Sequence, residues 1–451
     1  MKRILLLLAL STSSFIHSQS WVIQNTGFTT PSRGISEIKI VDANTVWAYA
    51  YDGTGGGAVV QEFTKTTNGG TTWTPGIINI GDATYDIANI CPISATTAWA
   101  AGVHNTNGLG KIYKTIDGGT TWTQQNATGY VTAGSSWLNL VHFFDANNGI
   151  TVGDPAPGND FEVFRTNNGG TTWTVIPGLS IPNSANGEYG YGSGFAAVGN
   201  TLWFVTTKGK IYKTTDMGAS WVKLTSPIPD FGGYDTPASS GKLYFRDANN
   251  GVILASTDTG ATYKLYTTSD GGANWSAGVA YTGGYNRVLS YIPGTAAIVA
   301  TSANNTAPSV AGSAYSTNNG TSWTTIDTAV QRGVVSFFDG STGWCGGFNT
   351  NATTGGIFKY SGPALSVKDF NNTSEFSAYP NPTNGTIKLS SSVNNVSNVA
   401  VFDMLGKEVL TKNFSNLNEV EVDLSGLNNG VYFLKAATNN GGVQTMKIVK
   451  N

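Results

Sequence analysis

A motif of eight residues, which we call the corner because it forms a tight turn, recurs six times in this sequence. It constrains the fold more than any other feature. The pattern is Thr/Ser-x-Asp/Asn-x-Gly-x-x-Trp, and it begins at Thr66, Thr115, Thr166, Thr214, Thr268 and Ser316. The tryptophans that end it are 48 to 54 residues apart, and Trp21 precedes the first of them by 52 residues. A period of about 50 residues holds four short strands, which is the size of one propeller blade.

The corner has a local physical mechanism. The Asp or Asn side chain accepts backbone N–H bonds across a tight turn, and Gly adopts the positive φ that a Cβ would penalise. The Trp then fills the wedge between neighbouring strands. We therefore assign a structural role to the repeated residues, which are Asn68, Trp73, Asp117, Trp122, Asn168, Trp173, Asp216, Trp221, Asp270, Trp275, Asn318 and Trp323.

A second column of bulky apolar residues precedes each corner. Its members are Trp47, Trp99, Ile150, Trp203, Val252, Ile298 and Trp344. Each unit thus reads as four strands, A to D, with the corner Trp opening strand D. The seventh unit has strands A to C between Val334 and Tyr360 but no corner Trp, and Trp21 to Gln24 supplies its strand D. We predict an all-β chain whose residues 19–363 form a seven-bladed β-propeller, closed by its N-terminal strand.

Composition supports this fold class. Charged residues make up only 12% of the chain, Gly numbers 57 of 451, and aromatic residues reach 11%. The aromatic content argues against a disordered chain. Lys and Arg (25) do not outnumber Asp and Glu (27), so a nucleic-acid partner is not expected.

The N-terminus has the pattern of an export signal. Met1 to Arg3 is positively charged, Ile4 to Leu10 is apolar, and small or polar residues follow to Ser18. We predict a signal peptide over residues 1–18 and no transmembrane segment after its removal. Cys91 and Cys345 fall in different repeats, so we expect buried free thiols rather than a disulfide.

The C-terminal part leaves the repeat. Residues 364–376 are predicted to be a linker, and residues 377–451 alternate strands with Gly/Asn turns, as in a small β-sandwich. This stretch opens with Tyr379-Pro380-Asn381-Pro382 and contains Asp403-Met404-Leu405-Gly406-Lys407 and Leu427-Asn428-Asn429-Gly430-Val431-Tyr432. These motifs resemble the type A C-terminal sorting domain of the bacterial type IX secretion system. The resemblance implies the secretion machinery as a partner, and secretion or display on the outer surface of a diderm bacterium.

The six corners also match the Asp-box (BNR) motif. They resemble the propellers of sialidases, xyloglucan-type glycosidases, sortilin and photosystem II assembly factors. The resemblance concerns the scaffold, and function has to be argued from a site.

Long loops on the edge opposite the corners are the predicted site. The D–A loops at 174–191 and 222–239 and the B–C loops at 153–162 and 302–314 carry aromatic residues beside carboxylates, a combination that suits sugars. Packing of these aromatics within their own loops is the competing interpretation. The predicted ligand-binding residues are Trp137, Tyr189, Tyr191, Tyr234, Asp235 and Arg287.

Two classes of function remain open. The first is a binding propeller that recognises a polysaccharide or a surface protein. The second is an extracellular glycoside hydrolase or polysaccharide lyase on the same edge, with His104, His142, Asp154 and Glu188 as candidate catalytic residues. No metal site or cofactor is predicted, because two histidines lack an evident third ligand. No catalytic constellation stands out, which favours the binding propeller.

Overall fold

The computed structural model divides the chain into two compact units, Met1–Asp369 and Phe370–Asn451, which are described separately. It describes residues 20–451 except 126–128, 132–136, 156–159, 260–261, 286–287, 304–309, 366–375, 392–394, 405 and 439–442. The predicted signal peptide and most of the predicted linker lie outside the described residues. Within the described residues, no helix is long and apolar enough to cross a membrane.

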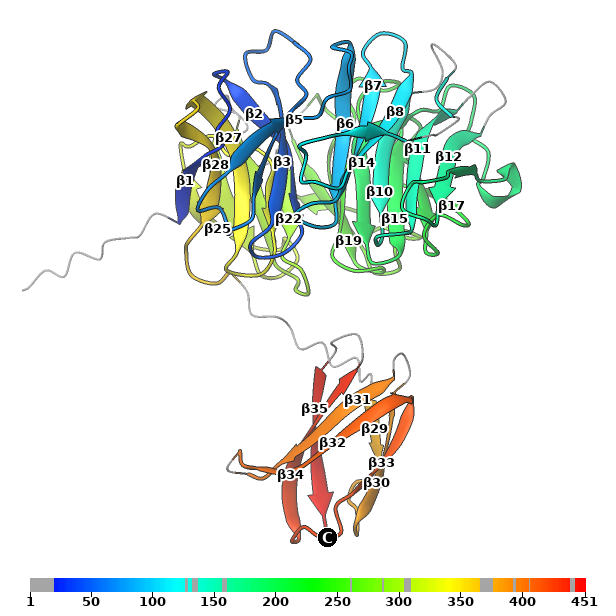
Figure 1. The fold of residues 1–451 in the computed structure, drawn as a ribbon, viewed down its shortest axis with the longest axis vertical. Coiled ribbons are helices and arrows are strands. Elements are labelled where there is room, and N and C mark those ends of the chain that lie inside the picture. Colours follow the sequence, from blue (N-terminus) through cyan, green and yellow to red (C-terminus); the bar gives the residue numbers. More distant parts are fainter. Residues whose placement is uncertain are drawn as a thin grey trace, which may run out of the picture. The chain divides into compact units, whose positions relative to one another are not determined.

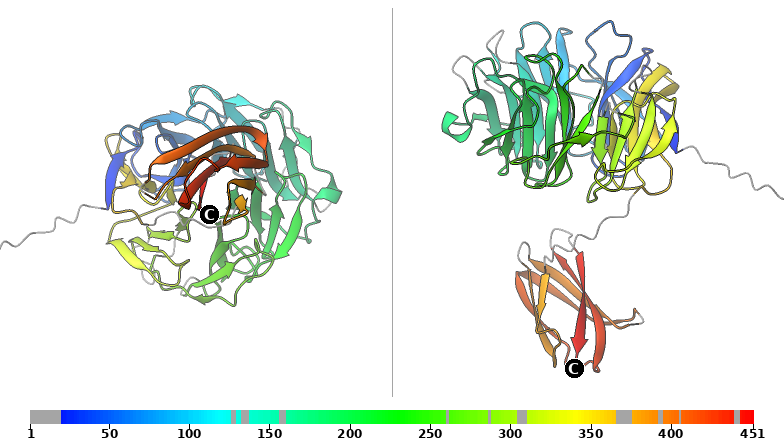
Figure 2. Two further views of the ribbon diagram at one scale, coloured as in Figure 1. Left: turned by 90° about the horizontal axis from the view of Figure 1, so that it is seen from below. Right: turned by 180° about the vertical axis from the view of Figure 1, so that it is seen from behind.

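The first unit is a ring of four-stranded antiparallel blades (Figures 1 and 2). Blade 1 has β2 Arg33–Ile40, β3 Val46–Asp52, β4 Glu62–Thr66 and β5 Thr74–Ile77. Blade 2 has β6 Tyr85–Pro92, β7 Ala98–His104, β8 Gly110–Thr115 and β9 Thr123–Gln124. Blade 3 has β10 Leu138–Phe143, β11 Gly149–Pro155, β12 Phe161–Thr166 and β13 Thr174–Val175, and the 3-10 helix Gly178–Ser180 follows it.

The next three blades follow the same plan. Blade 4 has β14 Gly190–Val198, β15 Thr201–Thr206, β16 Lys210–Thr214 and β17 Val222–Thr225. Blade 5 has β18 Ser240–Phe245, β19 Gly251–Ser256, β20 Lys264–Thr268 and β21 Val279–Ala280. Blade 6 has β22 Val288–Tyr291, β23 Ile298–Ser302, β24 Gly312–Ser316 and β25 Thr324–Thr328.

The seventh blade is assembled from both ends of the propeller, as the sequence predicts. It combines β26 Val335–Phe337, β27 Gly343–Asn351 and β28 Thr354–Tyr360 with β1 Trp21–Asn25. β1 pairs antiparallel with β28, and Trp21 lies opposite Tyr360. Pairing with β1 leaves strand C of this blade without the exposed edge that an open ring would have.

The two predicted columns build the interior of the blades. All seven residues of the column on strand B, from Trp47 to Trp344, have no exposed surface. Each blade is hydrophobic on both faces because it packs between two neighbours, so its strand B is almost continuously buried. Cys91 and Cys345 are free thiols inside this core.

The repeated corners are held by the predicted hydrogen bonds. In the first of them, Thr66 Oγ1 accepts a bond from Gly70 N at 2.9 Å and donates to Asn68 Oδ1 at 2.9 Å. Asn68 Oδ1 also accepts a bond from Thr72 N at 2.9 Å. The same bonds recur around Asp117 and Asp270. The bond from the Thr121 hydroxyl to Asp117, and the bond from Asn274 N to Asp270, contribute most to lowering each carboxyl pKa to about 2.

Each corner lies on the same edge of its blade as the A–B turn. Gly69 N donates to Asn44 O at 2.9 Å in blade 1, and Gly169 N donates to Asn147 O at 2.9 Å in blade 3. We call this edge of the propeller the corner rim. The B–C and D–A loops therefore share the opposite edge, which we call the loop rim.

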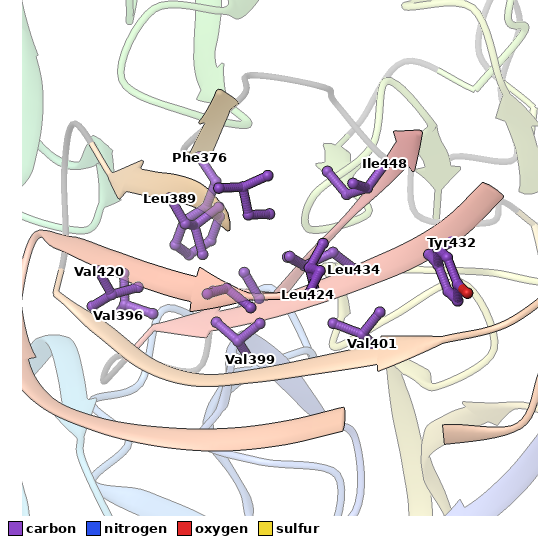
Figure 3. Packing of buried hydrophobic residues seen from close by; sticks show 13 residues of the cluster. Phe376, Leu389, Val396, Val399, Val401, Val420, Leu424, Tyr432, Leu434 and Ile448 are labelled. Atoms are coloured by element: carbon purple, nitrogen blue, oxygen red, sulfur yellow. The ribbon is translucent and has the colours of Figure 1, made fainter. Parts of the chain in front are cut away.

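The second unit is a two-sheet sandwich. One sheet has the order β29-β30-β33 and the other β32-β31-β34-β35. Side chains from both sheets meet between them, including Phe376, Leu389, Val399 and Leu434 (Figure 3). The strands are β29 Phe376–Tyr379, β30 Thr386–Ser391, β31 Val396–Phe402, β32 Glu408–Leu417, β33 Glu419–Asp423, β34 Gly430–Thr438 and β35 Val443–Lys450.

Candidate functional site

Two long D–A loops of the loop rim bring three predicted tyrosines together. Tyr189 precedes β14 and Tyr234 precedes β18, and their rings meet edge to face at 5.6 Å. Tyr234 is 67% exposed. Tyr191 is half-buried beside them, and its hydroxyl accepts a bond from Tyr234 N at 3.3 Å. The structure thus places Tyr189, Tyr191 and Tyr234 at one point of the rim.

A buried carboxylate fixes the loop that carries Tyr234. Asp230 accepts backbone bonds from Gly232, Asp235 and Thr236 at 2.7 to 3.0 Å. It also accepts a bond from the Tyr191 hydroxyl at 2.6 Å. Burial opposes ionisation of Asp230, but these donors outweigh it and lower its pKa. The loop is therefore preorganised rather than merely long.

A charged pair lies next to the exposed tyrosine. Lys208 Nζ, in the B–C turn of blade 4, is 3.0 Å from Asp235 Oδ2. Both side chains are partly exposed, so each can exchange its partner for a polar group of a ligand. We call Tyr189, Tyr191, Lys208, Tyr234 and Asp235 the tyrosine platform.

Trp137 lies directly before β10, in the D–A loop that joins blades 2 and 3. Its indole ring covers Gly108 in the B–C loop of blade 2, where a Cβ would approach the ring to 2.5 Å. Its carbonyl accepts a bond from Asp154 N at 2.8 Å. The Trp137 ring thus packs against a loop of the neighbouring blade. Arg287 lies outside the described residues.

The candidate carboxylates are occupied by protein donors. Asp154 is buried between blades 3 and 4, where Asn139 Nδ2 and Gly190 N each donate to Oδ1 at 2.8 Å. Burial outweighs these donors and raises its pKa to about 6. Glu188 is also buried and accepts bonds from Ala185 N and Thr206 Oγ1, and Lys223 Nζ lies 3.1 Å from it.

The two histidines lie at opposite ends of their blades. His104 pairs with Tyr85 at the start of β6, on the loop rim, and its ring meets the Tyr85 ring at 5.2 Å. His142 pairs with Ile150 beside an A–B turn, near the corner rim. Burial lowers the His142 pKa to about 3, and the positive charge of Lys39 contributes to the shift. The structure therefore does not bring the histidines together at one channel mouth.

The described arginines that lie near the start of a strand A are paired with carboxylates. Arg33 forms an ion pair with Glu62 at 3.0 Å, and Arg332 forms one with Asp327 at 2.5 Å. Each guanidinium is thus committed to a carboxylate of its own part of the ring. Within the described residues, no group of three or more His, Cys, Asp or Glu is placed to hold a metal ion.

Sequence reasoning missed one further corner, and it lies on the loop rim. Ser256 Oγ donates to Asp258 Oδ1 at 2.7 Å, and Thr262 N donates to the same oxygen at 3.0 Å. This segment connects strands B and C of blade 5, unlike the six C–D corners. Its sequence, Ser-Thr-Asp-Thr-Gly-Ala-Thr-Tyr, fits the pattern once Tyr263 is allowed in place of Trp.

Comparison with known proteins agrees with this architecture. Residues 377–451 match the model of the "Secretion system C-terminal sorting domain" family. A search of curated proteins found no match.

Solved structures of similar fold include "YCF48 bound to D1 peptide", with 13% identity and a TM-score of 0.51. YCF48 from Cyanidioschyzon merolae has 12% identity and a TM-score of 0.52. Each alignment covers 76% of this chain, and 97% and 99% of the respective chains. At this identity the similarity shows the fold alone. The chain is therefore a β-propeller protein with a type IX secretion system sorting domain, secreted or attached to the outer surface of a diderm bacterium.

Proposed function

We propose that the propeller is an extracellular binding module that recognises a glycan at the tyrosine platform. The observation that carries this proposal is Tyr234, a residue that is 67% exposed on a loop that Asp230 holds in place. An exposed aromatic ring stacks on the apolar face of a sugar, and the neighbouring Lys208 and Asp235 suit its hydroxyl groups. Because the loop is already ordered in the free protein, binding loses little conformational entropy in this loop.

The test is a glycan array followed by titration of the full chain with each glycan that binds. Tyr234→Ala removes the stacking ring and should weaken binding about tenfold or more. Tyr379→Ala is the matched control, because Tyr379 is also exposed but belongs to the sorting domain. Binding that survives Tyr234→Ala contradicts the assignment. An array without any binding glycan, combined with capture of a surface protein that Tyr234→Ala abolishes, would indicate a protein ligand at the same platform.

The alternative is a carbohydrate-active enzyme on the loop rim, and Asp154 is the observation in its favour. A carboxyl group with a pKa of about 6 suits a general acid near neutral pH. Reducing-end release from polysaccharides that the protein binds tests hydrolysis, and absorbance of an unsaturated product tests lyase activity. Either activity, abolished by Asp154→Asn, would support the enzyme over the binding module.

A further inference from the structure

Each of the six corners on the corner rim makes one backbone hydrogen bond outside its own turn. The residue after the Asp or Asn has a positive φ, and its N–H donates to a carbonyl of the A–B turn of the same blade at 2.7 to 3.2 Å. The donors are Gly69, Gly118, Gly169, Met217, Gly271 and Asn319. A corner therefore does more than close a turn, because it also fixes the loop beside it.

The corner in the B–C loop of blade 5 makes the same kind of bond, but to the loop that carries Tyr234. Thr259 follows Asp258, has a φ of +64°, and donates its N–H to Ala238 O at 3.2 Å. Ala238 lies in the D–A loop between β17 and β18. The corner motif thus recurs on the loop rim, where the loop that it fixes belongs to the candidate binding site.

The backbone of Thr259 is in a conformation that needs support. A β-branched residue rarely adopts the left-handed region, and four of the six corners on the other rim have Gly at this position. Asp258 supplies the support, since Oδ1 accepts bonds from Ser256 Oγ at 2.7 Å and from Thr262 N at 3.0 Å. The Thr262 hydroxyl donates to Oδ2. These bonds close the turn on both sides of Thr259 and so set the direction of its N–H.

The bond at Ala238 acts on the residues that hold Tyr234. The next residue, Ser239, donates its N–H to Thr236 O at 2.7 Å, and its hydroxyl donates to Asp230 O. The Asp230 carboxylate in turn accepts a bond from Thr236 N at 3.0 Å. The end of the loop is therefore hydrogen-bonded to its start, and a bond that fixes one fixes the other.

Blade 5 holds this loop through two backbone bonds. Gly241 N, in β18, donates to Phe231 O near the start of the loop at 2.9 Å, and Thr259 N donates to Ala238 O near its end. The bond from Gly241 does not depend on the corner. Loss of the corner should therefore loosen the loop without releasing it from the blade.

We propose that the loop-rim corner of blade 5 positions the tyrosine platform. Asp258 and Thr259 are positioning residues, because they act on Tyr234 through the loop that carries it. The inference rests on the proposed glycan site for its functional part. Its structural part, that the corner orders the loop, is measured without any ligand.

The first test is hydrogen–deuterium exchange of the full chain, followed in peptides that span residues 230–239. Asp258→Ala should speed their exchange about tenfold or more, because the loop opens more often. The matched control is Asp270→Ala, which removes the same side chain from the other corner of blade 5, on the corner rim. It should leave exchange in residues 230–239 unchanged.

Two conservative variants separate the corner from the side chains that compose it. Asp258→Asn should keep slow exchange, since Asn occupies this position in three of the six other corners. Thr259→Gly should keep it as well, because Gly retains the N–H and adopts a positive φ without strain. Thr262→Ala is a milder second variant if Asp258→Ala does not fold, and it should speed exchange in the same direction. Thermal unfolding of each variant verifies that the ring is intact.

The second test is calorimetric titration with a glycan that the wild type binds. Asp258→Ala should weaken binding about tenfold with a less favourable entropy, since binding then has to order the loop. Asp270→Ala should bind like the wild type. Exchange in residues 230–239 that is unchanged in Asp258→Ala, or equally fast in Asp270→Ala, would overturn the proposal. Faster exchange in Asp258→Ala alone, in a protein that binds no glycan, would support the positioning role and contradict the glycan site.

Discussion

Single carboxyl groups in this propeller show how strongly environment sets ionisation. Asp117 in a corner is exposed and accepts bonds from the Thr121 hydroxyl and backbone, which lower its pKa to about 2. Asp154 accepts two bonds as well, but it is buried between two blades and its pKa rises to about 6. Desolvation outweighs hydrogen bonding only where water is excluded.

This difference predicts a pH-dependent stability effect for Asp154→Asn. The folded-state pKa of Asp154 is above its unfolded value, so the folded state favours the protonated carboxyl. The wild type therefore loses stability as pH rises from about 4 through 6, by roughly 2–3 kcal/mol for a shift of about two units. The Asn variant does not titrate, and it should be more stable than the wild type at pH 8 but not at pH 4.5.

Urea unfolding of both proteins at pH 4.5, 6 and 8 measures the effect. Asp117→Asn is the matched control, since Asn occupies the same position in three of the six corners. Its carboxyl titrates below this pH window, so the control should show no comparable gain between pH 4.5 and 8. A difference between Asp154→Asn and the wild type that stays constant with pH would contradict the prediction.

At the scale of strands and corners, a column of lysines joins neighbouring blades. Lys65, Lys114 and Lys359 on strand C donate to the carbonyl groups of Gly118, Gly169 and Gly69 in the next blade, at 2.9, 2.8 and 2.7 Å. Each ammonium also lies 4.7 to 5.5 Å from the ring of the strand B tryptophan in its own blade. The lysine thus links the tryptophan column of one blade to the corner of the next.

We predict that Lys114→Met destabilises the propeller by about 1–2 kcal/mol. The substitution keeps an apolar stem over Trp99 but removes the charged donor to Gly169 O. Lys264→Met is the control, because Lys264 is also on a strand C but is exposed, and it should change stability by less than about 0.5 kcal/mol. Equal effects of the two substitutions in urea unfolding would show that the link between blades contributes nothing.

The burial and contacts of a residue could be predicted from the sequence where that residue follows the repeat. Trp47 and Trp344 recur in phase with the corners, so their burial on strand B follows from the period. The strand C lysines recur with the same period. Their contacts were not predicted, because a polar residue in a repeat does not by itself indicate burial. The contacts of the loop rim have no such period. Trp137 on Gly108 and Glu188 beside Lys223 depend on the paths of loops of unequal length, which no local pattern encodes.

For the whole molecule, the decisive element is the closing strand. The Trp21 side chain has no exposed surface, its ring meets Tyr360 at 5.2 Å, and its indole N–H donates to Ser313 Oγ at 3.0 Å. Ser313 in turn bonds Asp327, which is paired with the buried Arg332. One residue at the start of the propeller is therefore tied to both blade 6 and blade 7.

Trp21→Ala should destabilise the propeller by about 3–5 kcal/mol, as expected for removing a fully buried tryptophan. Loss of the closing strand also uncovers the edge of β28, so the variant should form dimers or larger species. Val22→Ala changes an exposed residue of the same strand and should behave like the wild type. Urea unfolding and size-exclusion chromatography measure both effects, and a monomeric Trp21→Ala of unchanged stability would refute this account of closure.

Closure by the first strand also sets the order in which the protein reaches its native state. Gly355 N donates to Asn25 Oδ1 across 330 residues of chain, so pairing β1 with β28 carries a large entropic cost of loop closure. Contacts of such high sequence separation slow folding. In a chain made from the N-terminus, the strand that is synthesised first is the last to find its partner. The propeller therefore cannot close until the last strand of its seventh blade has been synthesised.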